Sequence, residues 1–145
     1  MVLRLRIHRI LGIGIRIHKG NRSKVKGCLI SKCRTGIEVV SADPLICFNT
    51  VKHCFENGIV TIAKDSMRCD GLIKFNKIIQ NKDNGILCAG ENNHTRIEKN
   101  HEISSNRLAG IKAIECAQIV ISNNKIFGNF CQGILLTETT SAHIE

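Results

Sequence analysis

The sequence predicts an all-β fold, a right-handed single-stranded parallel β-helix (a solenoid) of about five coils with 22–27 residues per coil. The first observation is a regularly spaced Gly-Ile pair, because repeat periods in the twenties are typical of solenoids. The second is that each unit holds short β-branched runs separated by Asn and Gly. The third is a hydrophobic content of 43% with only 3% aromatic residues, which suits a core of stacked Ile, Val, Leu and Cys. Parallel strand crossovers are right-handed, so the same hand is expected here.

The Gly-Ile pairs mark the start of the successive coils. They begin at Gly12, Gly36, Gly58, Gly85, Gly110 and Gly133. Each coil is expected to carry three strands, which in the unit from Gly58 cover residues 59–62, 72–75 and 77–79. The same pattern appears from Gly36 at 37–40, 45–48 and 50–52, and from Gly110 at 111–114, 118–121 and 125–127. Differences in coil length are therefore expected to lie in loops.

Two sets of Asn residues recur at fixed places in the coils. The sets are Asn49, Asn76, Asn100 and Asn124, and Asn81, Asn106 and Asn129. Asn tolerates left-handed backbone angles, so it is expected to turn the chain from one strand into the next. Asn side chains stacked at one height also form hydrogen-bonded ladders. We therefore predict two Asn ladders that run along the solenoid.

The chain is predicted to be a single β-helix domain, residues 1–145, in which the basic residues 1–26 form a partial first coil. Solenoids need polar caps over their terminal strands, and the sequence shows none, so a fragment of a longer solenoid is expected. The net charge of +9 is concentrated in residues 1–37, which hold ten Lys and Arg residues and no acid. Such a basic end can attract an anionic partner, and the alternative is a solvated strand face.

The eight Cys residues are expected to be free thiols that pack as small hydrophobic side chains. No Cys-x-x-Cys pair occurs, so the spacing typical of zinc sites is missing, and Cys88 stands where Leu136 stands in a later coil. Residues 1–20 do not have the pattern of a signal peptide, and free thiols favour a reducing compartment. The predicted location is therefore cytoplasmic or nuclear. No apolar run approaches the length of a membrane span, and no membrane partner is expected.

The repeated unit can be written as Asn-x-aliphatic-x-x-Asn-x-x-x-Gly-Ile, and it is clearest at residues 76–86 and 124–134. This frame covers residues 27–136 and resembles the parallel β-helix repeat of pectate lyases, polygalacturonases and non-enzymatic right-handed β-helix proteins, the pectin-lyase-like superfold. It looks most like the intracellular, Cys-containing form in F-box-only proteins, where the resemblance implies binding of substrates for ubiquitin ligation. F-box helices are absent from this sequence, so the ligase role itself is not carried over.

The motifs expected of a polysaccharide-cleaving β-helix do not occur in this sequence. Polygalacturonases resemble one another in Asn-Thr-Asp, Asp-Asp, Gly-His-Gly and Arg-Ile-Lys motifs, and the nearest match here is Arg96-Ile97-Glu98. Inverting hydrolysis needs two carboxyl groups placed to admit a water molecule, and no such pair is evident. Sugar-binding platforms also favour Trp or Tyr, and the chain has neither. No catalytic residue and no cofactor is predicted.

One arrangement of acidic and amide side chains is a weak candidate for a metal site. Asp43, Asp65 and Asn92 each lie seven residues after the Gly of a coil. If the coils are in register, these side chains stack about 4.8 Å apart, and adjacent carboxylates can share a Ca²⁺ ion. The alternative is two loop acids that point into solvent, and the sequence favours this alternative. No metal site is therefore predicted.

The candidate partner-binding surface is the column of residues that follow the Gly-Ile pairs, because alternation along a strand places them outward. The column contains Glu38, Val60, Leu87, Lys112 and Leu135. Three apolar residues on a solvent-facing strip indicate a partner surface, and the alternative is cover by a loop or by other parts of a larger protein. Nucleic acid is not favoured, despite the basic first 37 residues, because aromatic stacking platforms are scarce.

These features predict a non-catalytic protein-interaction scaffold, with substrate recognition in a ubiquitin-ligase-like context as its narrower form. The alternative function is a carbohydrate-active β-helix, lyase-like or hydrolase-like, or a degenerate relative of one. The expected partner is a protein, and the identity of that partner does not follow from the repeat, because a fold carries function only through its particular sites.

Overall fold

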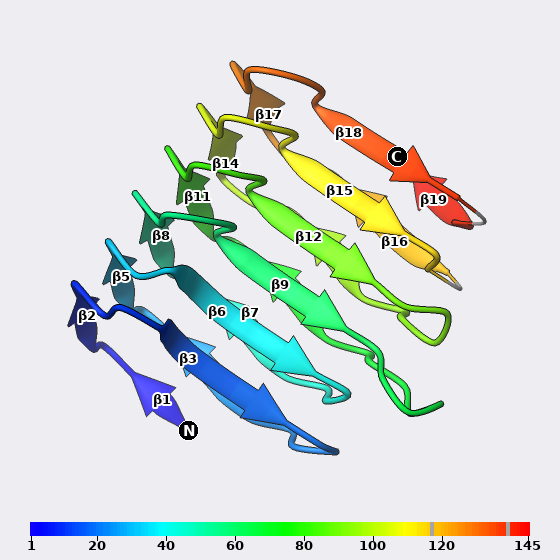
Figure 1. Cartoon of the computed structure of the whole chain (residues 1–145), viewed down its shortest axis with the longest axis horizontal. Coiled ribbons are helices and arrows are strands. Elements are labelled where there is room, and N and C mark those ends of the chain that lie inside the picture. Colours follow the sequence, from blue (N-terminus) through cyan, green and yellow to red (C-terminus); the bar gives the residue numbers. More distant parts are fainter. Residues whose placement is uncertain (117, 139) are drawn as a thin grey trace.

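The structure, a computed structural model, describes residues 1–116, 118–138 and 140–145. Within these ranges the chain is a parallel β-helix of about six turns, with three parallel sheets and no helix. Figure 1 shows the coils stacked side by side, with the N-terminus in the blue end coil and the C-terminus in the red one. The predicted fold class is confirmed. The number of turns is about six rather than about five, because residues 2–18 already supply one strand to each sheet.

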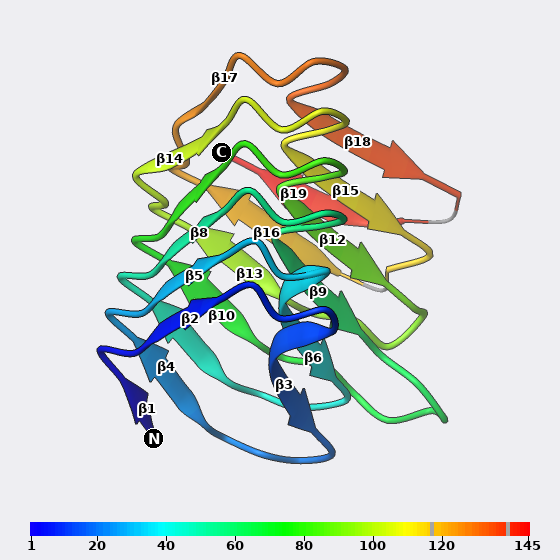
Figure 2. The same cartoon turned by 60° about the vertical axis from the view of Figure 1, so that its left-hand side comes forward.

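Each turn contributes strands to three sheets, which we name A, B and C, and Figure 2 shows the strands recurring from coil to coil. Sheet A contains β1 (Val2–Leu3), β4 (Lys24–Lys26), β7 (Leu45–Cys47), β10 (Leu72–Lys74), β13 (Arg96–Glu98), β16 (Ile119–Ser122) and β19 (Ala142–Ile144). Sheet B contains β2 (Arg6–His8), β5 (Leu29–Ser31), β8 (Thr50–Lys52), β11 (Lys77–Ile79), β14 (Glu102–Ser104) and β17 (Ile126–Phe127). Sheet C contains β3 (Ile13–His18), β6 (Thr35–Val40), β9 (Ile59–Ile62), β12 (Ile86–Ala89), β15 (Ile111–Ile114) and β18 (Ile134–Thr137).

The predicted strands of the unit from Gly58 agree with β9, β10 and β11, except that β10 ends at Lys74 and not at Phe75. Phe75 leaves the strand because its φ is 56°, in the left-handed region. The register is regular, since Ile73 lies opposite both Ile46 and Ile97. The nine residues between β9 and β10 bulge out as a loop, and the coil lengths therefore differ without disturbing the sheets.

The tight turn between sheets A and B is made by the residue before each Asn of the first set. Phe48 and Phe75 have φ values of 57° and 56°, and Asn49 and Asn76 follow them. The expectation that Asn49 and Asn76 themselves adopt the left-handed conformation is wrong. The turn lies one residue earlier, so the Asn side chain points inward and bonds to the neighbouring coil.

Both predicted Asn ladders are present in the structure. In the first, the side-chain amide of Asn76 donates to Oδ1 of Asn100 at 3.1 Å. In the second, the side-chain amide of Asn81 donates to Oδ1 of Asn106 at 2.9 Å. Burying these amides costs little because every buried side-chain N or O atom of the described residues has a hydrogen-bond partner.

The core is a set of stacked aliphatic columns enclosed by the three sheets. Ile30, Val51, Ile78 and Ile103 form one column on the inner face of sheet B, and each is fully buried. β-branched side chains of equal shape stack well at the spacing of adjacent strands, which explains why Ile recurs at this height.

No helix among the described residues is long and apolar enough to cross a membrane.

Candidate functional site

The predicted outward column lies on the outer face of sheet C. Glu38, Val60, Leu87, Lys112 and Leu135 are successive partners in the parallel register of β6, β9, β12, β15 and β18. The structure therefore brings all five together in one line. Val60 is buried, with a relative exposure of 5%, although it does not belong to the core cluster. The geometry agrees with the sequence, and the partner-binding role of the column stays a prediction.

A second outward column on sheet C was missed from the sequence. Val40, Ile62, Ala89 and Ile114 are register partners two residues further along the same strands. None of them belongs to the core cluster. The sequence signal for this column was the last residue of each first strand. It lies two residues after the first column, and side chains two residues apart in a strand point to the same face.

Together these columns form an apolar patch on a regular sheet, which we call the sheet C face. It consists of Val40, Val60, Ile62, Leu87, Ala89, Ile114 and Leu135. In Figure 1 no other part of the described chain lies in front of these strands. Its polar border includes the ion pair between Nε of Arg16 and Oε1 of Glu38, which are 2.6 Å apart, whereas Lys112 lies within the patch between Leu87 and Leu135. An apolar patch with a polar border is the usual arrangement of a partner surface.

The structure does not stack Asp43 on Asp65 and Asn92. Asp43 lies instead beside Asp70, whose backbone N–H donates to Oδ1 of Asp43 at 3.1 Å. Asp65 and Asn92 line a separate shallow hollow together with Glu91 and Glu115. The reason is the long loop after β9, which adds residues between the end of sheet C and the position aligned with Asp43. In the part of the chain that the structure describes, no group of three or more His, Cys, Asp or Glu side chains could hold a metal ion.

The eight cysteines are free, and all except Cys131 are buried. Burial raises the pKa of Cys54 to about 12 and that of Cys116 to about 11, because a thiolate loses its hydration in the core. Burial also raises the pKa of Cys88. Cys54 is fully buried although it lies outside the strands, between β8 and β9. The buried thiols serve as small core side chains, and the raised pKa values of Cys54, Cys88 and Cys116 disfavour their thiolate forms.

We expect iodoacetamide at pH 8 to label one thiol per native chain, at Cys131, and eight in denaturant. Raising the pH to 10 should leave Cys54 and Cys116 unlabelled, because their raised pKa values keep them protonated and burial keeps the reagent away. Peptide mass spectrometry identifies the labelled sites. Labelling of Cys54 in the native chain at pH 8 would contradict the sealed core.

A cationic surface at the turn between sheets B and C was also missed from the sequence. We call it the basic corner, and it consists of Arg9, Lys32, Arg34, His53, Phe55 and Lys82, all of them exposed. Partial loss of hydration and the ammonium groups of Lys52 and Lys32 lower the pKa of His53, and the effect of the two ammonium groups indicates a positive local potential. The sequence did contain a signal for this surface. Both neighbours of an inward-pointing residue point outward, so the residues before and after the positions of the second Asn set could have been predicted to lie on the surface.

These observations define the class of the protein. It is a parallel β-helix repeat domain whose described residues contain no grouped metal ligands and whose surface offers an apolar sheet face and a cationic corner. The chain belongs to the NosD family, because the family model described as "Periplasmic copper-binding protein (NosD)" matches residues 9–145. Neither the comparison with curated proteins nor the comparison with solved structures gave a match.

The family match corrects two expectations from the sequence. The predicted cytoplasmic or nuclear location is contradicted, because the family is described as periplasmic. The narrower resemblance to F-box-only proteins has no support, since the matching family is NosD. The error arose from treating free thiols as a sign of a reducing compartment. Seven of these thiols are buried, and a thiol that oxidants and other thiols cannot reach stays free in either compartment, so its presence does not report the compartment.

Proposed function

We propose that this chain is a non-catalytic protein-binding scaffold of the NosD family and that the sheet C face is its partner surface. The observation that supports this function best is the set of apolar side chains from Val40 to Leu135 on a regular parallel sheet, interrupted in its first column by Lys112. The backbone groups of this sheet already bond between coils, so a partner would be bound through side chains. A rigid sheet loses little conformational freedom on binding, which favours this use of the surface.

The family description raises the question of copper, which binds thiolate, thioether and imidazole ligands. The buried thiols of this chain do not suit that role, because each of Cys28, Cys33 and Cys54 lies near a backbone carbonyl to which its Sγ can donate. Among the described residues no three His, Cys, Asp or Glu side chains converge. The donor set therefore does not fit a resident copper site.

The family description also supports a periplasmic setting for the proposed scaffold. The carbohydrate-active alternative gains no support from the described residues. Asp43 and Asp70 are adjacent and joined through a backbone hydrogen bond, so they do not face each other across the space that a sugar and an attacking water molecule would need.

Photo-crosslinking in the native cells tests the partner surface. Benzoylphenylalanine in place of Leu135 should give an adduct with a second protein, whereas the same group in place of the exposed Lys125 on the sheet B side should not. Adding Leu87→Lys should reduce the Leu135 adduct about tenfold, because a charge on an apolar interface is costly. An unchanged adduct, or one that joins only segments of the same protein, would reject the sheet C face as a partner surface.

The same substitution also tests the register of the face. Leu87→Lys should change the free energy of unfolding by less than about 1 kcal/mol, because the side chain points outward. Its neighbour Ile86 is fully buried, so Ile86→Lys should prevent folding. Circular dichroism during thermal unfolding compares the two variants. Unfolding of the Leu87→Lys variant would place Leu87 in the core.

A further inference from the structure

We propose that the basic corner binds an extended acidic segment of a partner protein, with an apolar side chain of that segment seated beside Phe55. This surface lies at the turn between sheets B and C, away from the sheet C face, so the inference goes beyond the proposed function. It is carried by the geometry of the groove, by its charge and by the nature of its lining.

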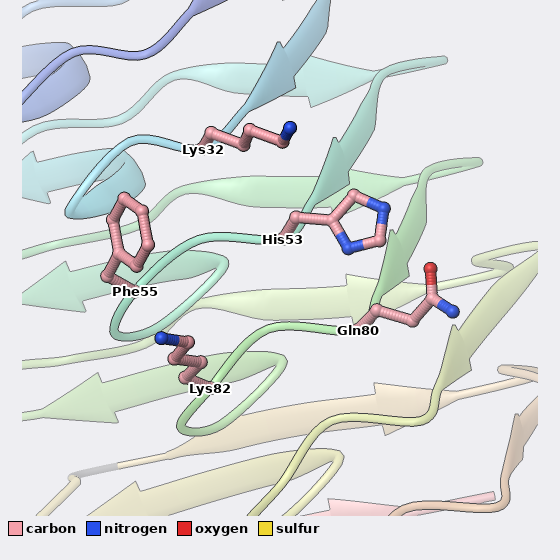
Figure 3. Close-up of a pocket in the computed structure, with 5 residues that line it drawn as sticks. All are labelled: Lys32, His53, Phe55, Gln80 and Lys82. Atoms are coloured by element: carbon pink, nitrogen blue, oxygen red, sulfur yellow. The ribbon is translucent and has the colours of Figure 1, made fainter.

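The corner is built by stacking two outward positions over successive coils. Backbone hydrogen bonds from Lys32 to Lys52 and from His53 to Ile79 bring Lys32, His53 and Gln80 into one line. Figure 3 shows these three side chains above one another, and beside them Phe55 above Lys82. A buried residue lies between the two lines and holds the residues on either side of it outward, as Cys54 does for His53 and Phe55. The groove therefore follows from the repeated conformation of the coils.

The groove has a volume of about 550 Å³ and is lined by Lys32, His53, Phe55, Gln80 and Lys82. A second hollow, lined by Arg9, Leu11, Lys32 and Phe55, continues it toward the N-terminal coil. Phe55 is 51% exposed and Leu11 is 94% exposed, so apolar surface lies open between the cations. The ammonium group of Lys82 lies 4.9 Å from the centre of the Phe55 ring. The ligand should therefore carry both apolar groups and negative charge.

The charge of the corner is uncompensated within the described chain. Arg9, Lys32, Arg34 and Lys82 form no ion pair with any described carboxylate. The nearest acids along the chain are Glu56 and Asp83, which follow Phe55 and Lys82. Glu56 accepts a hydrogen bond from the hydroxyl of Thr35 at 3.2 Å and is thus held on the sheet C side. An anion that enters the groove meets cations from three coils.

The form of the ligand follows from spacing and lining. Lys32 and Lys82 are two coils apart, about 10 Å, a span that three residues of an extended chain cover. Carboxylates two or three residues apart can therefore reach both ammonium groups, and the side chain between them lies beside the exposed part of Phe55. A neutral sugar chain would leave Lys32 and Lys82 without an anionic partner, and a nucleobase would find a single phenyl ring in the lining, that of Phe55, with the ammonium group of Lys82 over it. A peptide fits best.

Fluorescence anisotropy with the full chain tests this proposal. The probe is a labelled twelve-residue peptide of alternating Glu and Leu, and the comparison peptides replace every Glu by Gln or every Leu by Ala. The double variant Lys32→Glu, Lys82→Glu should weaken binding about tenfold or more, and Phe55→Ala should reduce the preference for Leu over Ala. The matched control is Lys64→Glu, Lys99→Glu, which makes the same charge change at exposed positions on other corners and should weaken binding less than about twofold.

A second readout is the pKa of His53, followed by NMR and assigned with the variant His53→Gln. The bound carboxylates should raise this pKa, because they favour the imidazolium form. Both results together support the proposal. Equal weakening by the control variant, an unchanged pKa of His53, or tighter binding of polygalacturonate or single-stranded DNA than of the peptide would overturn it. Self-association of the chain that the Lys32→Glu, Lys82→Glu variant abolishes would also overturn it, and would assign the corner to a second copy.

Discussion

Replacing Asn76 by Ala should lower the free energy of unfolding by about 3–5 kcal/mol, the largest loss expected for a single side chain here. Oδ1 of Asn76 accepts the backbone N–H of Asn49 at 2.9 Å and the side-chain amide of Asn49 at 3.0 Å. Its own amide donates to the carbonyl of Ile46 at 2.9 Å. Alanine would leave the N–H of Asn49 and the carbonyl of Ile46 buried without these partners. A ladder interrupted in the middle loses bonds on both sides.

Thermal and urea unfolding followed by circular dichroism measure this loss, and we expect the melting temperature to fall by about 10 °C or more. The matched control is Asn124→Ala. Asn124 makes the same kinds of bond, accepting from Asn100 and donating to the carbonyl of Ile97, but it is only half-buried. Water can replace part of what is removed there, so a loss of about 1 kcal/mol is expected. Equal losses for the two variants would show that the ladder bonds are not what stabilises the coil.

Replacing Gly85 by Ala should cost about 3 kcal/mol or more, although the change adds a single methyl group. A Cβ atom at this position would lie 2.6 Å from the carbonyl oxygen of Gly110 and 2.8 Å from Nδ2 of Asn106. The first contact is with backbone, so a rotamer change cannot relieve it. The two coils would have to separate, and the sheet C register between β12 and β15 would be strained.

The sequence offers a control for this substitution in the same repeat position. A Cβ atom at Gly133 would meet only Cγ2 of Ile126 at 3.6 Å, an ordinary contact. Gly133→Ala should therefore change the free energy of unfolding by less than about 1 kcal/mol, measured in the same urea titration. If Gly85→Ala is equally mild, close approach of neighbouring coils is not the reason for Gly at the start of each coil.

Much of the fold follows from single residues of the sequence. The period of the Gly-Ile pairs and the two Asn sets predicted the coil, the three strands in each turn and both ladders. The residue that makes the turn was misplaced by one position, because the preference of Asn for the left-handed conformation indicated Asn itself, whereas the preceding residue, such as Phe75, adopts it. Only the inward direction of Asn76, fully buried at the ladder, decides between them. The strand end at Lys74 follows from the same shift.

The sites were harder to predict than the fold, and the difficulty has a physical cause. Glu38 to Leu135 could be aligned because they follow Gly-Ile without insertions. Asp43 and Asp65 could not be aligned, because the loop after β9 is longer and changes the number of residues between sheet C and sheet A. The compartment was predicted wrongly because reactivity of a thiol depends on burial, which the spacing of Cys residues does not reveal. The positions of side chains on turns depend on the length of the loop, whereas the positions of side chains within the sheets do not.

The left-handed corner residues have a further consequence for how this protein can vary. Arg9, Lys32, His53, Gln80 and Ser105 share the same backbone conformation, with φ between 53° and 57°, yet they differ in charge, size and polarity. The conformation requires no particular side chain, because each one projects away from the solenoid. The residues of a single corner can therefore be substituted one coil at a time without a change in the interior. The positions that maintain the fold are therefore different from the positions at which the surface can vary.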